Sequence, residues 1–142
     1  MLTFLLAVDG SDCSLRAVDH LITHQSWFKE APTVHLLYVH PPIPDGRVQR
    51  HLGNDTLERY YREDSVERLA AAEAKLKAAG VAYQRHIHVG QPGAVIANQA
   101  RELRADLVLL GTHGWTAVVG AVMGSVAARV LHESSVPVLL VK

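Results

Sequence analysis

Residues 2–11 read LTFLLAVDGS and take the chain from a run of apolar side chains directly into a polar turn. The run Leu2–Val8 is typical of a strand whose two faces are both covered by helices. Asp9 ends this strand, and Ser11 or Asp12 can cap the free N–H groups of a helix that follows at once. A strand leading straight into a helix predicts the first unit of a parallel sheet.

The rest of the chain repeats this alternation of apolar and helical segments. Further strands are predicted over Val34–Val39, Ala82–Val89, Leu107–Leu110 and Val136–Val141. Further helices are predicted over Thr56–Ala79, Ala94–Leu103 and Ser125–His132, with an irregular loop from Pro41 to about Asp55. This alternation, without linkers or repeats, predicts one α/β domain over residues 1–142, an open parallel sheet with helices on both faces.

The composition restricts the class of protein. Lys+Arg 14 balances Asp+Glu 14 in 142 residues, which argues against a nucleic-acid partner because phosphate binding needs excess positive charge. Cys13 is the only cysteine, so an internal disulfide and a cysteine-rich zinc site are excluded. Residues 107–128 carry no formal charge, but glycines and His113 interrupt them, which favours a buried strand, loop and helix over a membrane span. We therefore expect a cytoplasmic protein with no membrane partner.

The two outermost strands differ in polarity. Ala82–Val89 mixes polar and apolar side chains, a pattern suited to a sheet edge. Val136–Val141 is apolar, and an edge of that character would aggregate unless it were central or paired with another chain. A two-fold dimer is the commonest arrangement of that kind, so we expect a homodimer through Val136–Val141.

Two strand ends carry residues suited to a ligand. Asp9-Gly10-Ser11 follows the first strand, and residues 111–114 (GTHG) follow the fourth, ahead of the helix that begins near Gly124-Ser125. In open parallel sheets ligands bind beyond the carboxyl ends of the strands. A helix N-terminus presents unsatisfied N–H donors, so Gly124, Ser125 and Val126 could hold an anion such as phosphate. Glycine-rich turns also serve chain reversal alone, and neither a Walker A loop nor a GxGxxG fingerprint is present.

The spacing of the glycines is more specific. Residues 111–125 read GTHGWTAVVGAVMGS, which resembles the ATP-binding motif of the universal stress protein family. The resemblance extends to VDGS at 8–11, GQP at 90–92, ADL at 105–107, GSVA at 124–127 and VPVLLV at 136–141.

The resemblance implies a five-stranded parallel sheet of order 3-2-1-4-5 and a dimer formed through the last strand. It also implies ATP bound between the first and fourth strands. ADP and AMP are alternatives, and Mg²⁺ carried with the nucleotide would neutralise much of the phosphate charge. The implied binding residues fall into four groups by role. Gly111, Gly114, Gly124 and Ser125 would surround the phosphates and ribose, Asp9 would reach the ribose or adenine, Ala7, Val39 and Leu110 would line the adenine pocket, and His113 and Val126 would complete the site.

One departure from the family pattern affects the expected charge of the site. Many ATP-binding members carry a Lys or Arg between the second and third glycines of the motif, whereas residues 115–123 here have neither. A helix terminus alone contributes only about 0.3–2 kcal/mol per favourable charge. Arg16, or Arg47 or Arg50 on the long loop, could fold over the site and compensate.

Several residues have structural alternatives. Asp9 and Ser125 could simply cap helices. His20 with His24, and His86 with His88, could form metal sites, although no acidic or cysteine partner stands at a suitable spacing. Cys13 is expected to be a small buried side chain.

Three functions remain open. The first is a nucleotide-binding stress or signalling module with no catalytic residues and at most slow ATP hydrolysis. The second is a dimeric interaction module of the same fold that binds no nucleotide. The third, an enzyme that splits ATP at its α-phosphate, is disfavoured because residues 9–14 (DGSDCS) lack the glycine doublet such enzymes carry.

Overall fold

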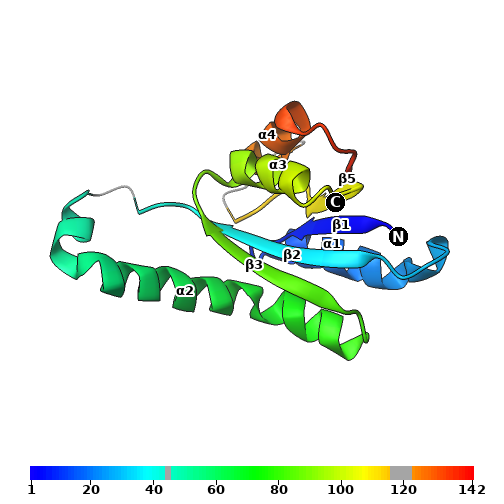
Figure 1. Ribbon diagram of the computed structural model, residues 1–142, viewed down its shortest axis with the longest axis horizontal. Coiled ribbons are helices and arrows are strands. Elements are labelled where there is room, and N and C mark those ends of the chain that lie inside the picture. The colour runs from blue at the N-terminus through cyan, green and yellow to red at the C-terminus, as the bar shows by residue number, and fades with distance from the viewer. Residues whose placement is uncertain (44–45, 116–122) are drawn as a thin grey trace.

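The computed structural model describes residues 1–43, 46–115 and 123–142, and within the second helix it does not describe the side chains of residues 46–52 and 54. One five-stranded parallel sheet runs through the molecule in the order β3-β2-β1-β4-β5 (Figure 1). Its strands are β1 (Thr3–Ala7), β2 (Thr33–His40), β3 (Tyr83–Val89), β4 (Leu107–Gly111) and β5 (Val138–Val141). The predicted fold class and strand order are confirmed.

The helices cover both faces of the sheet. They are α1 (Asp12–Thr23), α2 (Gly46–Ala78), α3 (Pro92–Glu102) and α4 (Ser125–Glu133), with a 3-10 turn at Gln25–Trp27. α1 and α2 pack on one face and α3 and α4 on the other (Figure 1). Leu6 and Leu36 are fully buried towards the first pair, while Leu5 and Leu37 are buried towards the second. This double coverage explains why β1 is apolar on both faces.

The start of α2 corrects the sequence-based boundary. An irregular loop was expected to about Asp55, but the chain is helical from Gly46 onwards. The helix is interrupted at Gly53, whose φ of 68° favours glycine. The helix therefore begins well before its expected start at Thr56. Figure 1 shows the first part of α2 extending past the end of the sheet.

The sheet edges have the expected polarities. β3 is one edge, and Gln84 and Arg85 on it are exposed. β5 is the other edge, and all four of its apolar residues are only half-buried in the single chain. Within the described parts of the chain, no helix combines the length and apolar character that a membrane crossing requires.

A pair of histidines joins β2 to β3. His35 Nδ1 lies 2.8 Å from His86 Nε2, so the two neutral rings share one proton in a hydrogen bond. Burial lowers the pKa of both rings, and the pKa of His86 is lowered further by His35 and His88. His86 is thus paired with His35 rather than with His88, and no group of three His, Cys, Asp or Glu side chains suited to a metal occurs among the described residues.

This pair should make the fold sensitive to acid. Unfolded histidine titrates near about pH 6.5, and a lower folded-state pKa means that the unfolded chain binds more protons below that pH. We therefore expect the free energy of unfolding to fall as the pH drops from about 6.5 through the folded-state pKa values. Urea unfolding between pH 7.5 and 5 should show a smaller loss for His86→Gln than for wild type. His132→Gln, at an exposed position of α4, is the control, and an undiminished loss in His86→Gln would contradict the assignment.

Candidate functional site

A cavity of about 350 Å³ opens at the carboxyl ends of β1 and β4. β1, β2, β4, α2, α3, α4 and the turns after the strands contribute to its lining. Every residue of the sequence-predicted site lines this cavity: Ala7, Asp9, Val39, Leu110, Gly111, His113, Gly114, Gly124, Ser125 and Val126. The fold thus brings together residues from distant parts of the chain in one concave site.

The wall of the cavity formed by the strands is apolar. Ala7, Val39 and Leu110 are all buried, and Ile96 of α3 extends the same surface. Small-molecule sites are typically concave and mostly apolar with a few polar groups. This wall therefore suits a flat, largely apolar ring system.

The turn after β1 holds a carboxylate at the cavity. Asp9 Oδ1 accepts a hydrogen bond from the Ser11 N–H at 2.9 Å. The N-cap of α1 is Ser11, whose hydroxyl accepts from the Ser14 N–H, so Asp9 does not cap this helix. Gly10, between Asp9 and Ser11, has a φ of 83°, and a Cβ there would lie 2.9 Å from the main-chain oxygen of Arg68. Backbone geometry therefore fixes the position of Asp9.

The start of α4 offers main-chain donors. Gly124 is the N-cap and provides no side-chain hydrogen bond, while its own N–H donates to the Thr112 oxygen at 2.6 Å. Ser125 is exposed as the first helical residue, so the interpretation of Ser125 as a cap is wrong. The first N–H groups of a helix have no partner within it. Those of Ser125 and Val126 belong to residues that line the cavity.

The glycines after β4 serve different purposes. A Cβ on Gly111 would lie 2.9 Å from the main chain and Sγ of Cys13, so this glycine lets α1 approach β4. A Cβ on Gly114 would instead collide with Asp9 Oδ2. Gly111 is thus needed for packing, whereas Gly114 keeps space at the site itself.

Cys13 is buried, as expected, under the turn that follows β4. Its Sγ lies 3.7 Å from Thr112 Oγ1 and 3.4 Å from the Val141 oxygen. Burial raises the pKa of Cys13, but the His113 main chain, the Thr112 hydroxyl and the charge of Arg16 together bring it below its ordinary value.

One face of α2 also lines the cavity, which sequence reasoning missed. Tyr60, Asp64 and Arg68, spaced one turn apart, all face it. The four-residue spacing was the available signal, but only the tertiary fold shows which face of α2 meets β2.

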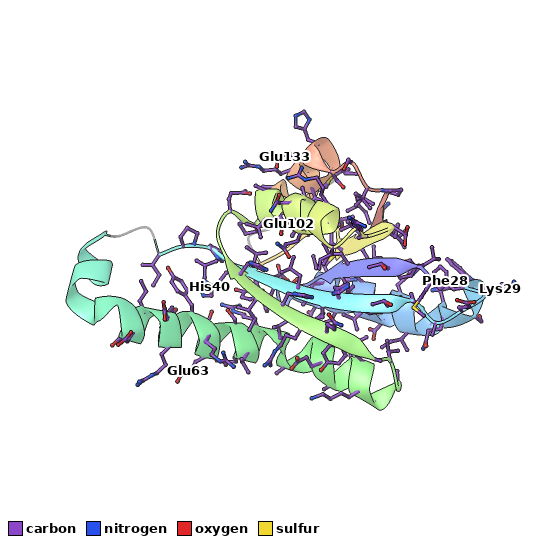
Figure 2. The ribbon with its side chains drawn as sticks, viewed as in Figure 1. Phe28, Lys29, His40, Glu63, Glu102 and Glu133 are labelled. Atoms are coloured by element: carbon purple, nitrogen blue, oxygen red, sulfur yellow. The ribbon has the colours of Figure 1, made fainter. Side chains whose placement is uncertain are left out.

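His40, at the end of β2, connects the sheet to this helix face. Its Nε2 lies 2.7 Å from Asp64 Oδ2 and its Nδ1 lies 2.7 Å from the Pro41 oxygen. Both ring nitrogens therefore lie at hydrogen-bonding distance from oxygen atoms, one on β2's own continuation and one on α2. Figure 2 shows His40 between the sheet and α2, whereas Glu63 on the same helix points away from the sheet.

Arg68 brings a guanidinium to the cavity. Its Nε lies 3.8 Å from Asp64 Oδ2, and its guanidinium carbon lies 5.5 Å from the centre of the Trp115 ring. Trp115 Nε1 in turn donates to the Asp9 main-chain oxygen at 2.7 Å. The arginines expected to supply charge do not show this placement. Arg16 donates to the Lys142 oxygen, and the side chains of Arg47 and Arg50 lie outside the described residues.

Known proteins resemble this chain over its whole length. The sequence pattern of the universal stress protein family matches residues 1–142. A universal stress protein of Thermus aquaticus is 34% identical over 148 residues, which cover 99% of this chain and 98% of the relative. The solved structure of hypothetical protein MJ0577 aligns with a TM-score of 0.82 at 25% identity, covering 99% of this chain and 94% of that chain. A universal stress protein in complex with cAMP aligns with a TM-score of 0.68 at 28% identity, covering 99% and 96%.

The two glycines after β4 should respond differently to an added methyl group. Gly111→Ala places an atom against the Cys13 main chain, and overpacking of this kind costs about 1–3 kcal/mol of the free energy of unfolding. Gly114→Ala should cost less, because it displaces a carboxylate side chain rather than backbone. Urea unfolding of the two variants measures the difference. Equal stability of Gly111→Ala and wild type would contradict the packing role.

Proposed function

Because the chain belongs to the universal stress protein family, we propose that it is a nucleotide-binding stress or signalling module. Its ligand is an adenine nucleotide held in the cavity at the carboxyl ends of β1 and β4. A similar universal stress protein has been solved in complex with cAMP, which supports this class of ligand.

The convergence of the glycine motif on one cavity carries the proposal. The strands give the cavity an apolar wall. The N-terminus of α4, which has no side-chain cap, also lines it. In this proposal the adenine lies against Ala7, Val39 and Leu110, with Asp9 near the ribose. The phosphates lie beside Gly111, Gly114, Gly124 and His113, at the main-chain N–H groups of Ser125 and Val126, which have no partner within α4.

ATP, ADP and AMP all fit this scheme. Mg²⁺ normally keeps several waters and binds through phosphate oxygens. We therefore assign it to the nucleotide rather than to a dedicated protein site.

Binding, with at most slow hydrolysis, is the proposed activity. A phosphoryl-transfer site needs a positioned base and electrophilic groups around the leaving phosphate. The two carboxylates that line the described cavity are already engaged, Asp9 by the Ser11 N–H and Asp64 by His40. Their role in this proposal is to shape the site, and no catalytic residue is assigned.

A homodimer in the cytoplasm is the proposed form of the protein. β5 is an edge strand whose apolar residues are half-buried in one chain, and pairing with a second copy would cover them.

A second candidate function is a dimeric interaction module without nucleotide. It is favoured by the lack of Lys and Arg in residues 115–123.

Calorimetric titration tests nucleotide binding. Wild type should bind Mg-ATP or AMP, while Gly114→Val should lose at least about tenfold in affinity because the new side chain displaces Asp9 and fills the ligand space. Ala82→Val, at an exposed position before β3, introduces the same side chain elsewhere and should bind normally. If wild type releases no heat with any nucleotide, the second candidate function is supported instead.

The mass in solution tests the dimer. Light scattering at micromolar concentration should give about twice the chain mass of 15.5 kDa. A mass of one chain across the accessible concentrations would contradict the proposed pairing through β5.

A further inference from the structure

We infer that Arg68 is the residue that binds the anionic tail of the nucleotide, supplying from α2 the positive charge that the glycine motif lacks. The inference rests on the proposed function. It adds a specificity-determining residue that lies outside the motif and on the opposite wall of the cavity.

The position of Arg68 carries the first step. It lines the same cavity as Gly114, Gly124 and Ser125. Its guanidinium lies 5.5 Å from the ring of Trp115, the residue directly after Gly114. Two turns earlier on α2, Tyr60 lies beside His40, with 6.0 Å between the ring centres. This face of α2 therefore runs from the end of β2, beside Tyr60, to the turn after β4, beside Arg68.

The charges around Arg68 carry the second step. Asp64 accepts a hydrogen bond from His40 at 2.7 Å, whereas its distance to Arg68 Nε is 3.8 Å, too long for a hydrogen bond. Asp64 is thus bonded to His40 and not to Arg68. Two other carboxylates lie nearby. Asp9 is bonded to the Ser11 N–H, and Glu67 lines the adjoining crevice with Arg68.

The chemistry of the side chain carries the third step. Arg presents a planar fork of N–H donors that matches phosphate oxygens, and charged hydrogen bonds of this kind are about twice as strong as neutral ones. Residues 111–126 contain no Lys or Arg. The Arg68 side chain is 40% exposed, so a phosphate can replace water at its guanidinium.

The experiment measures affinity for adenosine, AMP and Mg-ATP by calorimetry at two salt concentrations. Arg68→Gln should bind Mg-ATP about tenfold more weakly than wild type, with little change for adenosine. Added salt should weaken ATP binding less in Arg68→Gln than in wild type, because screening acts on the charge that was removed. Arg68→Lys should recover part of the affinity. Arg62→Gln, at an exposed position of the same helix, is the matched control and should behave as wild type.

The outcomes separate the two claims. If wild type binds ATP and Arg68→Gln binds it equally well with the same salt dependence, the role of Arg68 is overturned while the proposed function stands. Equal losses for adenosine and ATP, with unchanged salt dependence, would likewise overturn it by showing that Arg68 only shapes the wall. Arg68→Met, which keeps an unbranched aliphatic side chain without the charge, should show the same selective loss as Arg68→Gln. If wild type binds no nucleotide, the proposed function and this inference fail together.

Discussion

The cavity on which the rest of the site depends forms where the connections after β1 and β4 turn to opposite faces of the sheet. β1 and β4 lie side by side, yet β1 leads to α1 on one face of the sheet and β4 leads to α4 on the other. Where successive crossovers separate in this way, a crevice opens beyond the carboxyl ends of the strands. The apolar strands thus determine both the stability of the sheet and the position of the site.

Much of the fold and of the motif half of the site could be predicted from the sequence. The apolar runs located every strand to within about two residues, and the resemblance supplied the strand order. The glycine spacing predicted the residues that meet at the cavity, because glycine turns at strand ends converge on one edge of a parallel sheet. The capping roles of Asp9 and Ser125 were wrong because the residues directly before α1 and α4 are Ser11 and Gly124.

The wall contributed by α2 could not be predicted in the same way. Tyr60, Asp64 and Arg68 share a helix face, but the buried apolar residues that mark the sheet-facing side of α2, Leu69, Ala72 and Leu76, come after this stretch. In the stretch before Leu69, the bond between His40 and Asp64 joins α2 to the end of β2. The same bond gives the cavity a polar side that local sequence patterns do not reveal.

Gly10 brings the turn after β1 into close contact with α2. A Cβ at Gly10 would press on the main-chain oxygen of Arg68, so the turn and the helix touch backbone to backbone with no compliant side chain between them. Because packed interiors are nearly incompressible, a contact of this kind passes a movement of one segment on to the other. A displacement of α2 at Arg68 would therefore move the turn that positions the Asp9 carboxylate.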